Sequence, residues 1–334
     1  MQLLCTLLRD RIFYMKGERI LIPLSMLDED PGPYTMSFGF DLNPMIESIR
    51  RAGVLNPPFV DRDEEGRARI VAGYRRVLAL KVLQREEIEC FDLSGSGLSV
   101  SDRLLLNLHE NLATRNLNGT EKGMALERLT VHFPEQEVVE HYMPLLGLPP
   151  YRPVLASYLR IGQLEEKTRI SFAAGSLSFQ TVRSLLDMDP GAAAAFSEWF
   201  DTLQFNFNQQ SHFVELVMEV SSISNVAPER LLSTDGFRAI LKDNSLNGPQ
   251  KVKYVIDTLK AMRLPGLVAA EKEFQKRVRD LKLPEGVRVH HSPFFESPEY
   301  RLEIRFRDGK TLRKRVTELA SIQGLERVED PWKE

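Results

Sequence analysis

The sequence predicts an α+β protein with strands near both ends of the chain and helices in the middle. Residues 18–93 alternate short apolar, strand-like runs with helical segments. The stretch that follows, up to residue 286, shows only helical periodicity, and two further alternating runs come after it. With 334 residues, 43% of them apolar, the chain is long enough for several compact domains.

The N-terminal elements are expected in the order strand, helix, hairpin, helix and strand. Pro44 suits the first turn of the first helix, because the N–H that proline lacks has no helical partner there. Gly66 lies in an acidic turn between two strand-like runs, which is typical of a hairpin. We expect these elements at 18–27, 41–54, 57–73, 74–85 and 88–93.

The central region is expected to be helical from Ser101 or Asp102, either of which can cap a helix that ends near Arg115. A later helix begins at Asn118 or Thr120. Residues 134–164 then predict a helix, a tight turn with one glycine and two prolines, and a second helix. This arrangement is a helix-turn-helix candidate.

The C-terminal part is expected to form a small strand-containing unit. A charged helix at about 267–281 precedes the two alternating runs, and the pair Asp308-Gly309 predicts a turn before a short final helix. The expected domains are 1–115, 116–195, 196–265 and 266–334, and the sequence assigns no role to the third of them.

The overall charge gives no signature of nucleic-acid binding. The formal net charge is −3, so any DNA binding has to come from a local basic patch. Residues 141–185 offer one, because five arginines and lysines stand there against only two glutamates.

Cysteine and histidine usage argues against a metal held by protein ligands alone. Cys5 and Cys90 lie far apart and form no CxxC pair. The six histidines lack ligand spacing, and the neighbours His290 and His291 should point to opposite faces of a strand.

The N-terminal apolar run predicts neither a signal peptide nor a membrane span. Charged residues at positions 9–11 interrupt it, and no other stretch approaches the length of a span. We therefore expect a cytoplasmic protein without membrane attachment. Either Met1 or Met15 could be the translation start.

The joint near residue 73 is suited to an anion. An apolar strand-like run stops at Gly73, and a helix with Arg75 and Arg76 in its first turn follows. The first N–H groups of a helix are unpaired and carry positive potential, and two guanidinium groups would add to it. A phosphate is the most plausible ligand.

Three motifs in order resemble those of the ParB partition-protein family. They are "SIRRAGVLNPPFV" (48–60), "GYRRVLA" (73–79) and "ENLATRNLNGTE" (110–121). Downstream, "LGLPPYRPVLASYLRIGQL" (146–164) resembles the family's helix-turn-helix, and "GSLSFQTVRSLLDM" (175–188) its next helical segment. The resemblance covers roughly residues 18–190.

This resemblance implies a nucleotide-gated DNA clamp. CTP with Mg²⁺ would bind the N-terminal domain, which is of the ParB/sulfiredoxin type, and the helical domain would recognise a palindromic, centromere-like site in double-stranded DNA. The family serves chromosome or plasmid segregation on the nucleoid with a ParA-like ATPase partner, and slow CTP hydrolysis, where present, resets the clamp. The basic C-terminal unit is compatible with the family's dimerising end, so a homodimer is implied.

The resemblance also implies the site residues. Glu110 and Asn111 would hold Mg²⁺, because carboxylate and amide oxygens suit this cation when waters and phosphate complete its shell. Asn56 would take the catalytic, water-positioning role, although relatives often have the longer glutamine there. The nucleotide-binding residues would be Gly53, Gly73, Tyr74, Arg75, Arg76, Asn111 and Arg115.

Two positions in these motifs depart from the family pattern. Tyr74 stands where many members have glutamate, and Arg115 follows Thr114 one position later than the family's usual arginine.

The second helix of the helix-turn-helix candidate should enter the major groove of DNA. Arg152 at its start could bond guanine O6 and N7, with Tyr151 and Ser157 beside it. Arg160 and Arg183 are better suited to phosphate contacts. The packing face is expected to consist of Val154, Leu155, Tyr158 and Leu159.

Proteins of other functions share parts of this pattern. A sulfiredoxin is excluded because its reactive cysteine is replaced by Tyr74. A small-molecule kinase resembling the free-serine kinases would keep the phosphate joint but has no need of the helix-turn-helix. A DNA-binding adaptor without nucleotide remains open, whereas a nuclease would need an acidic cluster that the sequence lacks.

Overall fold

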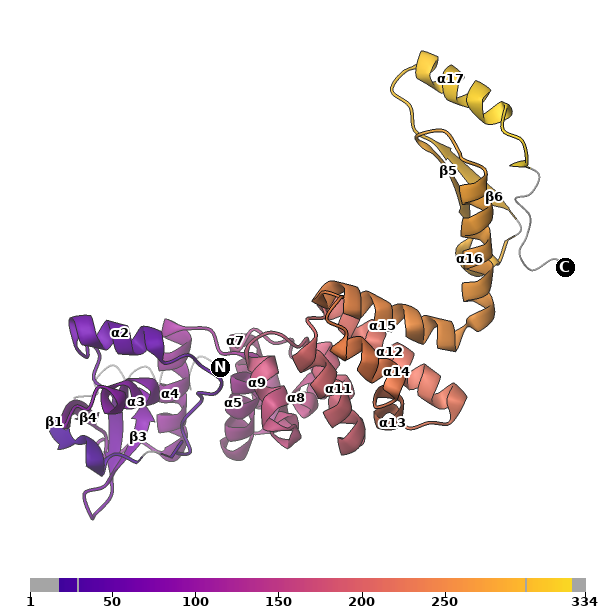
Figure 1. Ribbon diagram of the computed structural model, residues 1–334. Helices are drawn as coiled ribbons and strands as arrows, with labels where there is room; N and C mark the ends of the chain where they lie inside the picture. The colour runs from indigo at the N-terminus through magenta and orange to yellow at the C-terminus, as the bar shows by residue number, and fades with distance from the viewer. Residues whose placement is uncertain (1–17, 29, 298, 326–334) are drawn as a thin grey trace. The chain divides into compact units, whose positions relative to one another are not determined.

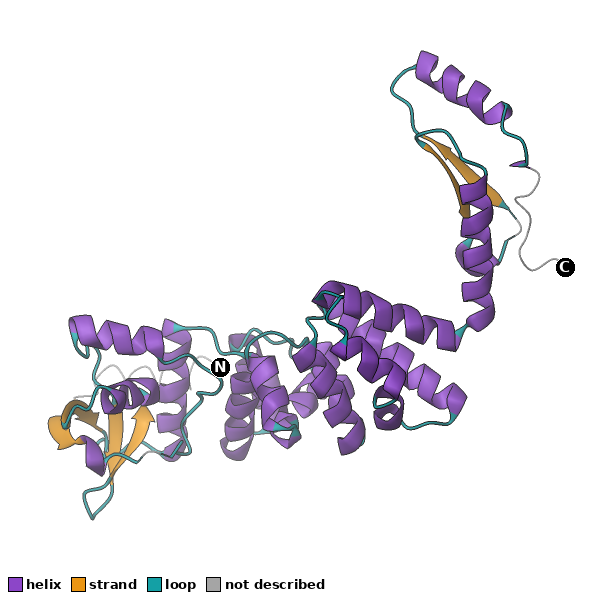
Figure 2. Ribbon diagram, viewed as in Figure 1, coloured by secondary structure: helices purple, strands orange, loops and turns teal. Residues whose placement is uncertain are grey.

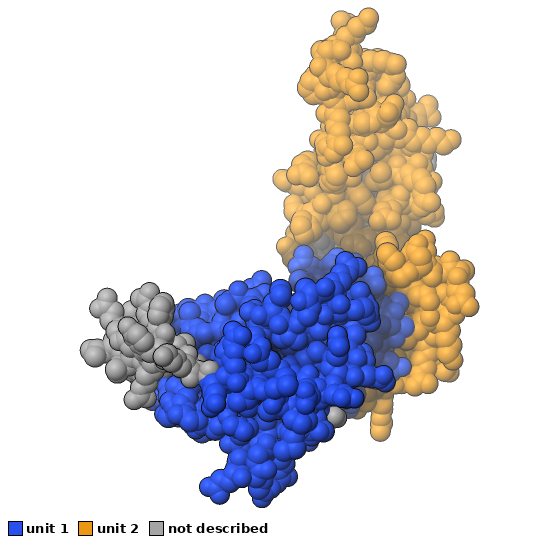
Figure 3. Space-filling model, turned by 90° about the vertical axis from the view of Figure 1, so that its left-hand side faces the viewer, with its two compact units in different colours: residues 1–211 blue, residues 212–334 orange. Residues whose placement is uncertain are grey.

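The computed structural model describes residues 18–325 except residues 29 and 298. The chain divides between residues 211 and 212 into two compact units, which Figure 3 colours blue and orange. A small sheet lies in the first unit, a strand pair lies in the second, and helices make up most of the remainder (Figure 2). The expected α+β class is therefore confirmed.

The N-terminal sheet has four strands in the order β1-β4-β2-β3 (Figure 1). Antiparallel pairing joins β1 to β4 and β2 to β3, while β2 and β4 run parallel. The hairpin expected at 57–73 is confirmed, with Gly66 at a φ of 83° in its turn. The strands are β1 (Glu18–Pro23), β2 (Phe59–Arg62), β3 (Ala68–Ala72) and β4 (Glu87–Asp92).

Helices cover this sheet and build its core. Side chains of β2, β3 and α3 interlock there, and Val60, Ala72 and Ala79 are completely buried. Ser99 caps α4 in a capping box with Asp102, so the expectation that Ser101 or Asp102 is the cap was wrong, and both lie in the first turn of the helix. The covering elements are η1 (Leu24–Met26), α2 (Asn43–Ala52), α3 (Tyr74–Val82) and α4 (Val100–Thr114).

The next elements are helical, as expected. Asn118, rather than Thr120, caps α5 in a capping box with Glu121. These elements are α5 (Gly119–His132), α6 (Glu135–Glu137), η2 (Val138–Tyr142), α7 (Met143–Leu145), α8 (Arg152–Leu159), η3 (Ile161–Gln163), α9 (Glu166–Ala173), α10 (Phe179–Leu186), α11 (Pro190–Thr202) and α12 (Phe207–Ser224).

The second unit ends in the expected strand pair, with a correction at residues 308 and 309. The Asp308 carboxylate accepts a hydrogen bond from Thr311 N at 2.7 Å, so Asp308 caps a helix and does not form a free-standing turn. The elements are α13 (Pro228–Leu232), α14 (Asp235–Lys242), α15 (Gly248–Arg263), α16 (Pro265–Asp280), β5 (Val287–His291), η4 (Pro293–Phe295), β6 (Tyr300–Ile304) and α17 (Gly309–Ala320).

The membrane prediction can be examined over most of the chain. Among the described residues, no helix combines the length and the apolar character needed to cross a bilayer. The N-terminal run, with Cys5, Met1 and Met15, lies outside the described residues.

Candidate nucleotide pocket and DNA-reading helix

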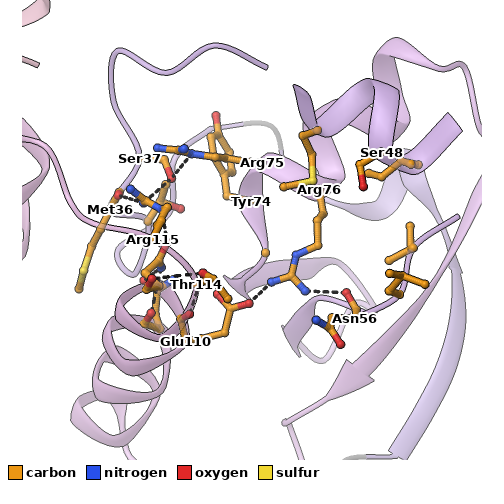
Figure 4. Close-up of a pocket in the computed structure, with 18 of the residues that line it drawn as sticks. Met36, Ser37, Ser48, Asn56, Tyr74, Arg75, Arg76, Glu110, Thr114 and Arg115 are labelled. Carbon is orange, nitrogen blue, oxygen red and sulfur yellow. Dashed lines mark hydrogen bonds and ion pairs between the residues drawn. The ribbon is translucent and has the colours of Figure 1, made fainter. Parts of the chain in front are cut away.

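Residues from the three separate motifs line one pocket of about 350 Å³ in the N-terminal part of the chain (Figure 4). The end of α2, the start of α3 and the end of α4 each contribute to its wall, and residues 35–37 close one side. The residues expected to bind nucleotide or metal, or to position water, all lie in this lining: Gly53, Asn56, Gly73, Tyr74, Arg75, Arg76, Glu110, Asn111 and Arg115.

Gly73 makes the strand-to-helix joint. Its φ of 97° is left-handed, a region that glycine reaches without the strain of a side chain. A Cβ at this position would lie 2.7 Å from Cβ of Pro58, so there is also no room for a side chain. The close approach of these two segments brings the first turn of α3 next to the loop that follows α2.

Arg76 joins two of the motifs across the pocket. Its Nη2 forms an ion pair with Oε1 of Glu110, and its Nη1 donates to the backbone carbonyl of Asn56 at 2.5 Å. The side chains of Arg76 and Glu110 are 13% and 22% exposed. Figure 4 shows the Arg76 guanidinium reaching between these two residues. The arginine and the acid therefore face the same cavity.

Arg75 and Arg115 converge on a buried carboxylate, that of Glu121. Arg75 Nη2 lies 2.6 Å from Oε1 of Glu121, and Arg115 Nη1 lies 2.5 Å from Oε2. Burial lowers the pKa of Arg75, and the nearby charge of Arg115 lowers it further, while Glu121 acts in the opposite direction. The two guanidinium groups thus share one anion.

The amide of Asn111 is fixed by its neighbours. Its Nδ2 donates to the carbonyl and side-chain oxygens of Asn107, and its Oδ1 accepts from Arg115 Nε at 2.9 Å. With Glu110 it offers two oxygen ligands at the pocket wall, which fits Mg²⁺ only if phosphate and water supply the remaining positions. In the described part of the chain, no group of three or more histidine, cysteine or acidic residues could hold a metal.

Asn56 and Tyr74 lie in the pocket wall in less direct ways. The contact of Asn56 with Arg76 is made through its backbone carbonyl, not its amide. The ring of Tyr74 packs partly against the hydrophobic core of the sheet. Neither observation assigns these side chains a role in chemistry.

The predicted site residues do not include several groups that lie in or beside the pocket. Glu121 is 1% exposed, and the capping-box spacing from Asn118 is the signal that could have drawn attention to it. Ser37 accepts hydrogen bonds from Arg75 and Arg115. The Thr35 hydroxyl is buried and makes no hydrogen bond within the described residues. The segment that holds Thr35 and Ser37 has no sequence signal of its own.

The helix-turn-helix candidate forms as expected in outline. A continuous helical segment of α6, η2 and α7 contains one π-helical stretch and ends before Gly147, whose φ is 68°. The amide of Leu148 donates to the carbonyl of Met143, which closes the turn. The second helix, α8, begins at Arg152.

The start of α8 is open to solvent. Tyr151 is 61% exposed, and the exposed side chain of Arg152 pairs with Glu135, which is exposed too. The Ser157 hydroxyl donates within the helix, to the carbonyl of Pro153. Arg183 is exposed on the neighbouring helix α10. These groups could reach a duplex without breaking buried contacts.

Two details of α8 differ from the sequence analysis. Leu159 is 37% exposed, so the expectation that it packs inward was wrong, whereas Leu155 and Tyr158 are buried. Arg160 lies 2.6 Å from Oδ1 of Asp187 and also bonds the Leu186 carbonyl, so it already ties α8 to α10. Arg160 is thus less available for phosphate than its sequence position suggests.

Comparisons with known proteins identify the N-terminal domain. Residues 17–96 match the family model of the ParB N-terminal domain. A probable chromosome-partitioning protein ParB of Vibrio cholerae is 26% identical over 64% of this chain and 72% of its own length. The chromosome-partitioning protein ParB of Myxococcus xanthus is 30% identical over 51% of this chain and 57% of its own length.

A solved structure is also similar over part of the chain. It is the C-terminally truncated ParB of Caulobacter crescentus in complex with CTP-γ-S, 22% identical, with a TM-score of 0.26 over 55% of this chain and 99% of that one. The family model covers the first two motifs, at 48–60 and 73–79, and ends before the third. Residues 17–96 thus form a ParB N-terminal domain, and the chain is similar to chromosome-partitioning ParB proteins over a longer stretch.

Proposed function

We propose that this protein is a CTP-dependent DNA clamp for chromosome or plasmid segregation. In this proposal the pocket binds CTP with Mg²⁺, α8 recognises a palindromic, centromere-like DNA site, and two subunits act together on the nucleoid with a ParA-like ATPase. Slow hydrolysis of CTP would release the clamp. The partition function follows the family, and the molecular details rest on the site.

The observation that carries the proposal is the convergence of the three motifs on one pocket. Their residues lie up to 62 positions apart, from Gly53 to Arg115, yet they line the same cavity. Three arginines at its wall provide charged, fork-shaped donors suited to phosphate. The unpartnered Thr35 hydroxyl offers a further polar contact to the remainder of a nucleotide.

Each part of the pocket has a defined task in this proposal. The first N–H groups of α3 and the Arg75 and Arg76 side chains bind the phosphates. Glu110 and Asn111 would hold Mg²⁺, which would supply charge neutralisation for the triphosphate. Glu110 pairs with Arg76, so the same carboxylate positions one of the phosphate-binding arginines.

A dimer is proposed through the C-terminal unit. Its sheet has only two strands, β5 and β6, and a two-stranded sheet is marginally stable in isolation. Leu302, Phe306 and Val316 are 47%, 53% and 46% exposed there. A second copy could cover these side chains. Analytical ultracentrifugation of the full chain and of Leu302→Glu tests this, and a wild-type monomer at micromolar concentration contradicts it.

Nucleotide titration is the direct test of the pocket. Isothermal titration calorimetry with Mg²⁺ and each of the four ribonucleoside triphosphates should show selective binding of CTP. Arg76→Ala should weaken it by about 100-fold, since two charged contacts are lost. Arg51→Ala removes an equal charge from the exposed end of α2 and serves as the control. Equal affinity for all four nucleotides would contradict a specific CTP site. It would favour a small-molecule kinase or a protein in which the nucleotide has no specific role.

Genome-wide DNA co-precipitation tests the other half of the proposal. Wild-type protein should be enriched around one palindromic site, and Arg152→Ala should lose that enrichment while the protein level stays unchanged. A flat profile for the wild-type protein would contradict a partition role and leave an adaptor or an enzyme.

A further inference from the structure

Glu121 gives the candidate pocket an internal counter-anion. Its carboxylate is 1% exposed and lies at the third position of α5. Besides the two arginines, it accepts hydrogen bonds from the backbone N–H of Phe38 at 3.1 Å and of Asn118 at 3.0 Å. Two guanidinium groups and two backbone N–H groups therefore surround this buried carboxylate. It lies behind the phosphate-binding arginines as their partner within the protein.

The donors of these arginines are largely committed. The contacts of Arg115 use all three of its side-chain nitrogens: Nε to Asn111, Nη1 to Glu121, and Nη2 to the Met36 carbonyl and Ser37. Those of Arg75 use Nε and Nη2, and its guanidinium also lies 4.2 Å from the centre of the Phe40 ring. Figure 4 shows both guanidinium groups beside Ser37. A phosphate group can bind these two guanidinium groups fully only if they break some of their existing contacts.

The charges around the pocket favour such an exchange. Arg75, Arg76 and Arg115 are balanced by two carboxylates, Glu110 and Glu121, which leaves a single net positive charge. A triphosphate brings several negative charges, and in a partly buried site each like-charge pair is costly. The ligand and Glu121 thus oppose one another, and both attract the same arginines.

We infer that a polyphosphate in this pocket competes with Glu121 for Arg75 and Arg115, so that Glu121 is the contact a bound nucleotide displaces. The inference rests on the proposed function, which it deepens by naming how the pocket is regulated. Without ligand, Glu121 satisfies the arginines and lowers the affinity of the pocket. With ligand, the arginines turn toward phosphate and their hold on α5 is released.

The position of Glu121 on α5 gives this exchange a structural consequence. Two residues further along α5, Gly123 packs against α8 and η3, since a Cβ there would lie 3.0 Å from the Tyr158 carbonyl oxygen and 3.2 Å from Cδ1 of Ile161. The start of α5 is therefore shared by the surroundings of the pocket and by the support of the candidate DNA-reading helix. A change in the contacts of Glu121 acts on both.

The test compares Glu121→Gln with Glu127→Gln in the full chain. Glutamine keeps the capping-box geometry but removes the charge, and Glu127 is an exposed residue of the same helix. Calorimetric titrations with Mg²⁺·CTP and with inorganic tripolyphosphate should show Glu121→Gln binding both about tenfold more tightly, the effect of removing one nearby like charge. Glu127→Gln should match the wild-type protein.

The outcomes separate the inference from the proposed function. If the wild-type protein binds CTP and Glu121→Gln binds it equally or more weakly, the competition is refuted while the nucleotide site stands. If neither protein binds CTP but Glu121→Gln gains affinity for tripolyphosphate, the proposed function fails and the counter-anion role holds. No binding of either ligand by either protein refutes both.

If Glu121→Gln does not fold in the absence of a ligand, a stability measurement tests the inference instead. The variant then lacks the anion that separates two buried arginines, and tripolyphosphate should restore a cooperative thermal transition in circular dichroism. The same concentration of tripolyphosphate should have a smaller effect on the thermal transition temperature of Glu127→Gln and of the wild-type protein. Failure of tripolyphosphate to restore the transition would overturn the inference.

Discussion

The arginines of the candidate pocket are largely buried and paired with carboxylates, whereas Arg152 at the start of α8 is 69% exposed and pairs with an exposed glutamate. This difference fits the ligand proposed for each region. A small polyanion needs donors that folding has already placed and partly desolvated. A duplex brings its own extended charged surface, so the groups that meet it can stay solvated until contact.

This contrast also separates structure from function in the two regions. A substitution in the pocket should weaken both the stability of the fold and the binding of the ligand, because the same ion pairs contribute to both. A substitution at the exposed start of α8 should disturb DNA recognition alone.

Leu155→Ala should cost the most, because this side chain is 2% exposed in the core beneath α8. We expect a loss of about 3 kcal/mol in the free energy of unfolding, measured by urea denaturation. Leu159→Ala on the same helix should cost less than about 1 kcal/mol. Similar losses for the two variants would mean that the inner and outer faces of α8 have been misassigned.

Gly73→Ala should be next, because the new Cβ meets Pro58 and the backbone is left-handed. We expect about 2 kcal/mol of destabilisation together with weaker binding of CTP. Gly95→Ala is the control, since a Cβ there meets nothing within 4 Å and its φ is not positive. A Gly73→Ala protein as stable as this control would show that the strand-helix joint is not sterically constrained.

Arg152→Ala should weaken binding to the preferred DNA site by about 1–3 kcal/mol, the usual loss for one bidentate base contact. Fluorescence anisotropy with matched and scrambled duplexes measures it. Because its ion pair with Glu135 is exposed, the unfolding free energy should hardly change. Arg160→Ala should do the reverse and reduce stability more than base discrimination, as it bonds Asp187 and Leu186. If Arg152→Ala weakened binding to the matched and the scrambled duplex equally, Arg152 would be a phosphate contact and not a base contact.

The pair of Arg62 and Asp92 offers an ion pair outside the pocket. Burial alone would raise the pKa of Asp92, but hydrogen bonds from Ser94 and Arg62 outweigh it and hold the pKa below its usual value. Asp92→Asn should therefore cost about 1 kcal/mol at neutral pH and leave CTP affinity unchanged.

The sign of its pH dependence follows from linkage. A lowered folded-state pKa stabilises the fold above the unfolded value of about 4, and this contribution is lost as the pH falls through the folded-state pKa. Unfolding curves of the wild-type protein and Asp92→Asn should therefore converge in acid. A gap that persists at low pH would mean that the pair acts through packing.

Local signals in the sequence predicted much of the fold, and the motifs predicted nine of the nineteen residues that line the pocket. The glycine at residue 73 followed by two arginines, the capping residue Asn118 and the alternating runs each depend on a few neighbouring residues. The same signals gave errors where two local structures share one pattern. Asp308-Gly309 suits a turn as well as a helix start. Leu159 fits the helical period of the packing face of α8, but that period does not show whether another element covers this side chain.

The order of the elements, the strand-helix joint and the charged residues of the motifs can be read from the amino-acid sequence, since backbone geometry and short spacings encode these features. The pairing of the charges depends on how the chain packs. Glu121 meets Arg75 across 46 residues and the amide of Phe38 across 83, and Arg160 turns to Asp187 on another helix. Such pairings depend on distances and burial that exist only after the chain has packed, so no local pattern specifies them.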